Sequence, residues 1–327
     1  MNRALFLRWL AALSAAPAAS LPLAAQPAYP NRPITFKVPY APGGPTDVSS
    51  RVIADELSRR LGQPVVVSNR PGAATAIGTE LVKAGPADGY TLLLGSSTTF
   101  SLNPLQYKKL NYRLEDFEPI GAIADVPYVL VVNNNLPVRN VQEFIAWSQA
   151  RPEGFTFGTV GQGSSTHIAG LMLAKAINAK GVPVHYKGSS NVQADLLAGV
   201  LDAAVDPLVT SLQMHKSGKA RIIATVGARR SSDFPDVPTL AEQGVRSLDT
   251  VPATFGVLVR AGTPAPIVAR LRQALAAVIA DPAVKTRLRT LGLEASAVEG
   301  EDFSRLLRTQ EAWYRREIEE SKIQFAE

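Results

Sequence analysis

The sequence predicts an α/β fold of two similar domains, each a mostly parallel sheet flanked by helices. Runs rich in β-branched residues alternate with runs whose apolar residues recur at helical spacing. The order strand, Gly-rich turn, helix, strand, polar turn, helix and strand occurs twice along the chain. The length of 327 residues, 46% of them hydrophobic, is sufficient for two domains with separate cores.

The first residues are predicted to be an export signal and not part of the fold. Arg3 and Arg8 precede an apolar, Ala-rich run over residues 10–25, which Pro17 and Pro22 interrupt. A cleaved secretory signal has this form, whereas a membrane anchor needs about 20 unbroken apolar residues. We therefore expect residues 1–25 to be a signal peptide, although cleavage after Ala28 is also compatible with the sequence.

The composition excludes several classes of chemistry. The chain contains no cysteine, which excludes disulfides, zinc–thiolate sites and thiol nucleophiles and suits a protein exported to a bacterial periplasm. The net charge is +6, but acidic residues lie among the basic ones, and export removes nucleic acid as a partner. His167, His185 and His215 lack the paired spacing of a metal site. We expect no metal and no other cofactor.

The first half is expected to contain four strands and two helices. The strands are short runs of β-branched and aromatic residues, and the helices have apolar residues at helical spacing. The strands are expected at residues 33–40, 64–68, 90–94 and 117–124. The helices are expected from Asp47 to Gly62 and at 76–82, with turns at 69–72 and from Asn103.

The second half is expected to repeat this pattern, and a final segment then returns to the first domain. The strands are expected at residues 128–132, 155–159, 182–186, 201–205, 220–226 and 255–259. The helices are expected at 141–149, 168–177, 192–198, 267–279, 282–291 and 302–318. We expect crossings near Val126 and Thr250, so that residues 29–126 and 250–327 form one domain and 127–249 form the other.

Two Gly-rich turns, at residues 41–47 and 160–167, are the strongest candidates for a binding site. Each joins a predicted strand to the start of a helix, where free N–H groups and the positive end of the helix dipole favour an anion. Sheets of this class bind ligands at the carboxyl ends of their strands. We therefore expect the two turns to face each other across a cleft and to bind a small carboxylate.

The candidate ligand-binding residues all come from these strand ends. Asp47 is expected first to cap the helix after the first turn, while Asp206 is expected to contact the ligand or to fix the hinge. Arg70 and Lys187 have two open roles, neutralising a carboxylate or lying on the solvated surface. The full set is Tyr40, Pro42, Gly43, Gly44, Pro45, Thr46, Asp47, Thr98, Gly161, Gly163, Ser164, Ser165, Thr166, His167, Lys187, Gly188, Ser189 and Asp206.

The sequence contains no complete motif for catalysis. The G-x-S-x-G elbow of a serine hydrolase is missing, because residues 161–164 fail the pattern. The P-loop motif is absent, and the dinucleotide-binding glycine pattern is incomplete at both turns. We expect no catalytic residue. An exported hydrolase that uses Ser164 or Ser165 with His167 or His185 is the alternative from another functional class.

Several motifs cover essentially the whole mature chain in order: residues 40–47, 66–73, 86–93, 186–189, 235–239 with Glu242 and Gly244, and 262–268 with Leu271. They resemble motifs of the tripartite tricarboxylate transporter receptor family, and in particular its Bug-like periplasmic solute-binding proteins. The resemblance implies a type II periplasmic-binding-protein (Venus flytrap) fold and a monomeric receptor that delivers a carboxylate to a membrane permease. In that family two Gly-rich loops hold the ligand's carboxylate, which here are residues 42–47 and 161–167.

The chain departs from the family pattern at four places. Ala41 stands where a proline is common, and residues 73–75 replace a Gly-rich run. Residues 254–255 stand where a tryptophan often precedes the glycine, and His185 stands where a proline often precedes the tyrosine. These departures leave open mono-, di- and tricarboxylates, amino acids and aromatic acids as ligands. A ligand sensor for a membrane kinase is a further alternative with the same fold.

Overall fold

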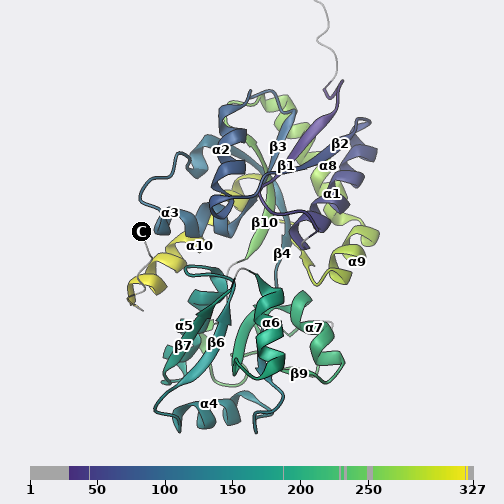
Figure 1. Ribbon diagram of the computed structural model, residues 1–327. Coiled ribbons are helices and arrows are strands. Elements are labelled where there is room, and N and C mark those ends of the chain that lie inside the picture. The colour runs from purple at the N-terminus through teal and green to yellow at the C-terminus, as the bar shows by residue number, and fades with distance from the viewer. Residues whose placement is uncertain are drawn as a thin grey trace, which may run out of the picture.

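The computed structural model describes residues 29–43, 45–186, 188–227, 230–231, 234–248, 253–320 and 322, so the expected signal peptide lies outside the described residues. The described strands form two sheets, each flanked by helices (Figure 1). We call the larger sheet with its helices lobe 1 and the smaller sheet with its helices lobe 2. The predicted α/β fold class with two domains is confirmed.

Lobe 1 is built on a six-stranded sheet in the order β11-β4-β10-β3-β1-β2. Helices α1, α8 and α9 pack on one of its faces, and α2 and α10 pack on the other. The strands are β1 (Ile34–Val38), β2 (Val65–Asn69), β3 (Thr91–Ser96), β4 (Phe117–Asp125), β10 (Thr254–Arg260) and β11 (Glu294–Ala295). The helices are α1 (Pro45–Leu61), α2 (Ala76–Ala84), α3 (Asn103–Gln106), α8 (Ala265–Ala280), α9 (Pro282–Thr290) and α10 (Gly300–Glu320), with shorter helical turns at Ala73–Thr75, Thr98–Leu102 and Leu114–Asp116.

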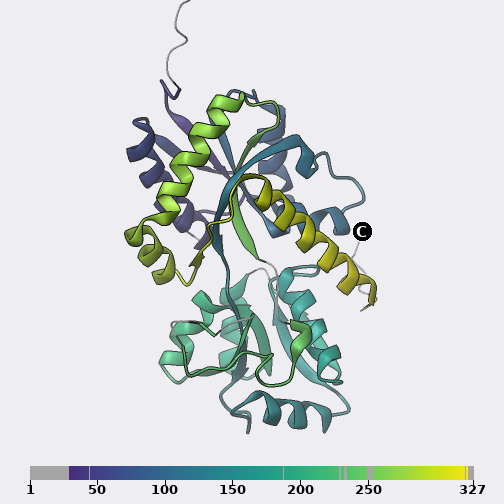
Figure 2. The same ribbon diagram turned by 180° about the vertical axis from the view of Figure 1, so that it is seen from behind.

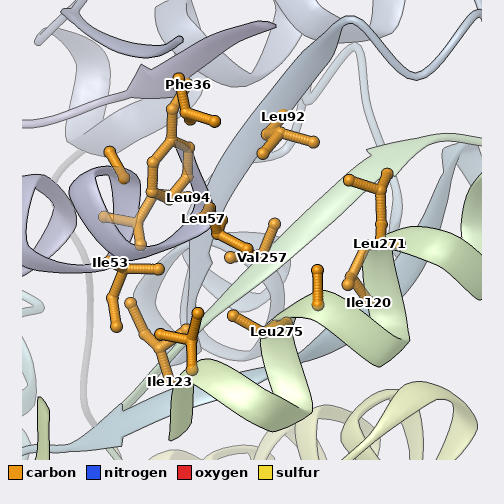
Figure 3. Close-up of a cluster of buried hydrophobic side chains, with 14 of the residues drawn as sticks. Phe36, Ile53, Leu57, Leu92, Leu94, Ile120, Ile123, Val257, Leu271 and Leu275 are labelled. Atoms are coloured by element: carbon orange, nitrogen blue, oxygen red, sulfur yellow. The ribbon is translucent and has the colours of Figure 1, made fainter. Parts of the chain in front are cut away.

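The main core of lobe 1 lies between its sheet and helices α1 and α8 (Figure 3). Residues from the strands and from two helices pack together in this cluster. They are Phe36 and Leu92 from the strands, Ile53 and Leu57 from α1, and Leu271 from α8. All five side chains are at most 1% exposed to solvent. This burial holds α1 firmly on the sheet, and therefore also fixes the turn that precedes α1.

Lobe 2 is built on a five-stranded sheet in the order β7-β6-β8-β5-β9. Helices α4 and α5 contribute to the core on one face, and α6 and α7 to the core on the other. The strands are β5 (Tyr128–Asn133), β6 (Phe155–Thr159), β7 (Gly181–His185), β8 (Ala203–Pro207) and β9 (Ala220–Val226). The helices are α4 (Val141–Gln149), α5 (Ser165–Ala176), α6 (Ser189–Ala198) and α7 (Leu208–Lys216), with a shorter helical turn at Arg246–Leu248.

Most described strands in each sheet run in one direction, as expected. Strands β1 to β4 are aligned, while β10 and β11 run the opposite way. Strands β6 to β9 are aligned, and β5 runs the opposite way. Strand β5 follows β4 directly out of lobe 1. A strand that enters a sheet at the carboxyl ends of its neighbours must run against them, which explains the reversed direction of β5.

Several elements differ from the sequence-based expectation. The expected turn at Asn103 is the short helix α3, because Pro104 occupies a first-turn position where its missing N–H does no harm. Helix α7 was not expected, since the hydroxyl and β-branched residues Thr210 and Ser211 have low helix propensity. Packing overrides this propensity, because Leu208 and Met214 are buried against lobe 2. Strand β11, which has two residues, is too short to leave a pattern.

Helix α10 contacts both lobes (Figures 1 and 2). Phe303 and Leu307 in its first half belong to a core cluster of lobe 1, whereas Tyr314 is buried in a cluster of lobe 2. Near its end, Glu320 pairs with Lys175 of α5 at 3.1 Å. The C-terminal segment therefore packs against both lobes, and the domain boundaries given above stay a prediction; residues 249–252 lie outside the described chain. In the part of the chain that the structure describes, no helix is long and apolar enough to cross a membrane.

Candidate functional site

The expected site residues lie on the edges of the two sheets that are joined to each other. Strand β4 ends at Asp125, on the same edge where β3 ends at Ser96. Strand β5 starts at Tyr128, which pairs with Pro207 at the carboxyl end of β8. Because two residues separate β4 from β5, these edges are at most roughly 11 Å apart along the chain. The carboxyl ends of both sets of parallel strands therefore meet where the lobes join.

The first turn is held closed by a carboxylate from the helix that follows it. Gly43 has a left-handed backbone (φ 82°), and its N–H donates to Asp47 Oδ2 at 2.9 Å. Asn69 Nδ2 donates to the other oxygen of Asp47 at 2.9 Å and to the carbonyl of Tyr40 at 3.1 Å. Arg51 adds a contact to each oxygen of Asp47, both at 3.1 Å. The turn, helix α1 and strand β2 are thus tied together through one side chain.

Burial of Asp47, which is 3% exposed, raises the pKa of this carboxyl group. The hydrogen bonds from Arg51, Gly43 and Asn69 outweigh burial, and the net effect is a lowered pKa. The carboxylate is therefore ionised at neutral pH and accepts hydrogen bonds from the protein's own turn. Asp47 does accept a backbone N–H, but it is the third residue of α1 and its donor lies in the turn, so the structure gives it the role of closing the turn in place of the expected helix cap.

We expect Asp47→Asn to destabilise the protein by about 1–2 kcal/mol at pH 7, because the charge-assisted bonds to Arg51 and Gly43 weaken. Since the folded-state pKa is lowered, the wild-type advantage should be present above about pH 4 and should shrink as the pH falls below it. Urea denaturation at pH 7 and pH 3 measures both effects. Asp55→Asn on the same helix is the control, because Asp55 is exposed and has only a 4.0 Å ion pair. An equal loss in both variants would contradict the assignment.

The second turn has the same internal arrangement with different chemistry. Gly163, also left-handed (φ 72°), donates its N–H to Nδ1 of His167 at 3.0 Å. Ser164 caps helix α5 by accepting the N–H of His167 at 3.2 Å and donates its hydroxyl proton to the carbonyl of Gly161 at 2.7 Å. Thr166 Oγ1 accepts the N–H of Val160 at 3.0 Å. In each turn, an acceptor four residues after a glycine closes the loop.

This arrangement corrects one expectation. The N–H groups of Gly43 and Gly163 are not free, because both bond to side chains of the protein itself. Their left-handed backbones shape the turns. Pro45 at the start of α1 has no N–H and the N–H of His167 bonds Ser164, so the other N–H groups in the first turns of α1 and α5 are the candidate donors to a ligand. Lobe 1 also reaches the second turn directly, where the side-chain amide of Gln106 donates to the carbonyl of Gly163.

Two histidines lie behind the second turn. The rings of His167 and His185 meet edge to face with centroids 4.7 Å apart, and His185 Nδ1 bonds the hydroxyl of Thr159 at 2.7 Å. Burial lowers the pKa of His167 to about 4, with His185 as a second cause, and burial also lowers the pKa of His185. His167 therefore accepts from Gly163 as a neutral imidazole whose proton is on Nε2. His167 therefore closes the second turn, and its expected contact with a ligand stays a prediction.

Two tyrosines, one from each lobe, lie next to the turns. Tyr40 bonds Ser96 Oγ at 2.8 Å, and Tyr128 bonds Ser165 Oγ at 2.8 Å. Burial raises the pKa of Tyr128 to about 12, and nearby Asp206 and Tyr40 add to the rise. Tyr128 is thus within electrostatic range of site residues from both lobes. Sequence reasoning missed Tyr128, although its position directly after the crossing between domains is a usable signal.

Asp206 is the most deeply buried acid among the expected ligand contacts, with 2% of its surface exposed. Its Oδ2 accepts hydrogen bonds from the hydroxyls of Thr210 and Ser211 at the start of α7. Burial raises the pKa of Asp206, and the neighbouring side chains, Ser189 among them, partly offset the rise. Asp206 therefore joins the starts of α6 and α7 through neutral groups.

The structure distributes the remaining expected residues between the two edges. Thr98 lies close enough to Tyr40 to lower its pKa, which burial raises. Gly188 precedes α6, and nothing lies within 4 Å of where its side chain would be. The positions of Gly44 and Lys187 lie outside the described residues, as does the side chain of Pro45. Within the described residues, no group of three or more histidine or acidic side chains could hold a metal ion.

Comparison with known proteins gives consistent matches along the chain. The sequence profile described as "Tripartite tricarboxylate transporter family receptor" matches residues 49–323. Protein BugT of Bordetella pertussis is 38% identical over 290 residues, which are 83% of this chain and 87% of BugT. These matches extend over both lobes.

Solved structures are similar over nearly the whole chain. The periplasmic binding protein BugD is 31% identical, with a TM-score of 0.76 over 91% of this chain and 100% of BugD. An R. palustris protein solved with adipate is 31% identical, with a TM-score of 0.82 over 91% and 100% of the two chains. MatC from Rhodopseudomonas palustris, solved with bound malate, is 26% identical, with a TM-score of 0.74 over 89% and 100%.

Proposed function

Because the chain belongs to the tripartite tricarboxylate transporter receptor family, we propose that it is a periplasmic receptor that captures a small carboxylate between its lobes and delivers it to a membrane permease of that transporter type. Adipate and malate are the ligands in two related structures. The predicted signal peptide supports a periplasmic location, and the family supports the permease as the partner. A monomer is sufficient for this role.

The observation that carries the proposal is the placement of the two turns. Each turn precedes the start of a helix, and the two turns belong to sheet edges that a two-residue connection joins. The groups around them are mainly neutral donors: the hydroxyls of Tyr40, Tyr128 and Ser165, and the N–H groups at the helix starts. Neutral donors and helix dipoles bind an anion without the strong trapping of a buried ion pair, which suits a receptor that must release its ligand.

Closure of the lobes around the ligand is part of the proposal. Residues 126–127 form the shortest connection described between the sheets, and we propose a hinge there, with residues 29–126 and 250–327 on one side and 127–249 on the other. Ligand contacts made only in the closed form would drive closure. Helix α10 packs on both lobes, so it must bend or slide when they move.

We propose no catalytic activity. In the hydrolase alternative, Ser164 or Ser165 would need a histidine as a general base. Instead, Ser164 caps α5 and Ser165 bonds Tyr128, while Nδ1 of His167 accepts the N–H of Gly163. This geometry favours a turn built for binding over an activated nucleophile.

A thermal-shift screen over small carboxylates tests the function. A ligand present at 100 times its Kd should stabilise the folded protein by roughly 2.7 kcal/mol. Matched concentrations of chloride and of uncharged amides control for ionic strength and for non-specific effects. A well-folded protein that no carboxylate stabilises, across mono-, di- and tricarboxylates, would refute the receptor proposal.

A further inference from the structure

Two aromatic rings lie on the edge of lobe 1 that is joined to lobe 2. Tyr40 and Phe255 lie edge to face, with ring centroids 6.1 Å apart, on the edge of lobe 1 that is joined to lobe 2. Both are only partly buried: one side of each packs on the core beneath α1, and the remainder is accessible. From lobe 2, Tyr128 lies near the second turn with its hydroxyl bonded to Ser165, but it is a core residue with 6% of its surface exposed. The accessible aromatic surface at the junction therefore comes from Tyr40 and Phe255 of lobe 1.

The alternating side-chain directions along strand β10 place Phe255 on the same face of the sheet as α1. Its neighbour Thr254 is buried and bonds Asp125 Oδ1 at 2.7 Å, and the other neighbour, Gly256, lies against Phe303 on the face that carries α10. Successive side chains of a strand point to opposite faces. Phe255 therefore lies on the face that carries α1, which is the helix preceded by the first turn.

Among the described residues, which do not include Lys187, the charges at the junction disfavour a second carboxylate on the ligand. Asp206 is buried close to Tyr128 and accepts hydrogen bonds from the hydroxyls of Thr210 and Ser211. Arg51 already pairs with Asp47 at the first turn. Arg70, which follows β2, is exposed to solvent, where an ion pair contributes little.

We propose that the ligand is a monocarboxylic acid with a flat aromatic body, whose carboxylate lies between the starts of α1 and α5 and whose ring packs against Tyr40 and Phe255. This inference rests on the proposed carboxylate-receptor function and narrows its ligand class. Aromatic rings prefer edge-to-face and offset contacts with other rings, and a pocket with several rings supplies them.

Binding of four acids to the full mature chain, measured by isothermal titration calorimetry, tests the inference. Benzoate and terephthalate share one ring and differ by a second carboxylate, while adipate and acetate lack the ring. Benzoate should bind at least tenfold more tightly than each of the other three. Tighter binding of terephthalate or adipate would overturn the inference, and a loss of that binding in Arg70→Ala would identify Arg70 as the second anion site.

A pair of variants separates the ring contact from general effects. Phe255→Ala should weaken benzoate binding about tenfold and leave acetate binding within twofold, because acetate has no ring to pack. Tyr107→Ala is the matched control: Tyr107 is 42% exposed beyond α3, and its removal should leave both affinities unchanged. Equal weakening of benzoate and acetate by Phe255→Ala would count against a ring contact. If no carboxylate binds the folded wild-type chain, the receptor function itself fails, which is distinguishable from a wrong ligand class.

Discussion

Replacing Gly43 by valine is expected to lower the affinity for the carboxylate ligand at least 100-fold while the protein stays folded. Gly43 has φ 82°, a conformation that costs a non-glycine residue about 1–2 kcal/mol and a β-branched one more. Nothing lies within 4 Å of the added Cβ, so steric overlap with the rest of the lobe is not the cause. The strain should move the turn and break the hydrogen bond from Gly43 to Asp47. The first turn would then no longer bind the carboxylate.

Gly62→Val is the matched control for this prediction. Gly62 has φ 72° and equally open surroundings, but it follows the far end of α1, about 25 Å from the turn. The two variants should lose similar stability in urea denaturation, and only Gly43→Val should lose the ligand-induced thermal shift. Retention of the shift in Gly43→Val, or its loss in Gly62→Val, would show that the first turn is not part of the binding site.

The course of the chain could be predicted because its strands and helices have clear local signals. Helix α4 begins after Asn140, as expected, since the Asn140 side chain accepts the N–H of Glu143 at 2.9 Å. Helix α5 begins at Ser165 and not at 168, because Ser164 is its cap and the hydroxyl residues after it are helical. Helix α7 is stabilised by packing, and packing leaves no local sequence signal.

The location of the candidate site is a prediction from the sequence, whereas the internal bonding of its two turns could not be predicted. Gly-rich turns at strand ends indicate the two sides of the candidate site, and the fold joins the sheet edges that carry these turns. The sequence suggested free N–H groups at both turns, whereas Asp47 and His167 occupy those of Gly43 and Gly163. Which side chain closes a turn depends on distances of a few ångströms. Tyr128 lies near site residues of both lobes only because the lobes join there, and the residues of the two lobes are far apart in the sequence.

Acid should destabilise this protein through His167, by up to about 3 kcal/mol between pH 6.5 and pH 4. The imidazole is 5% exposed, and burial lowers its pKa to about 4, with His185 as a second cause. In the unfolded chain its pKa is about 6.5. Within this interval the unfolded state binds a proton that the folded state does not, so stability is greatest above pH 6.5 and falls as the pH decreases. Protonation would also replace the acceptor of the Gly163 N–H by a donor and open the second turn.

His167→Asn retains an acceptor near the position of Nδ1 but cannot titrate, so its stability should fall less than that of the wild type between pH 7 and pH 4.5 in urea denaturation. His215→Asn is a comparison variant: burial also lowers the pKa of His215, whose Nδ1 accepts the N–H of Ile222 at 3.1 Å, so it should reduce the acid sensitivity as well, without changing the Gly163 bond. NMR titration of the imidazole carbons should assign a pKa near 4 to His167, and a value near 6.5 would refute the account. With a folded-state pKa of about 4, His167 stays mostly neutral at pH 4.5, so ligand-induced stabilisation should persist there in the wild type, in His167→Asn and in His215→Asn.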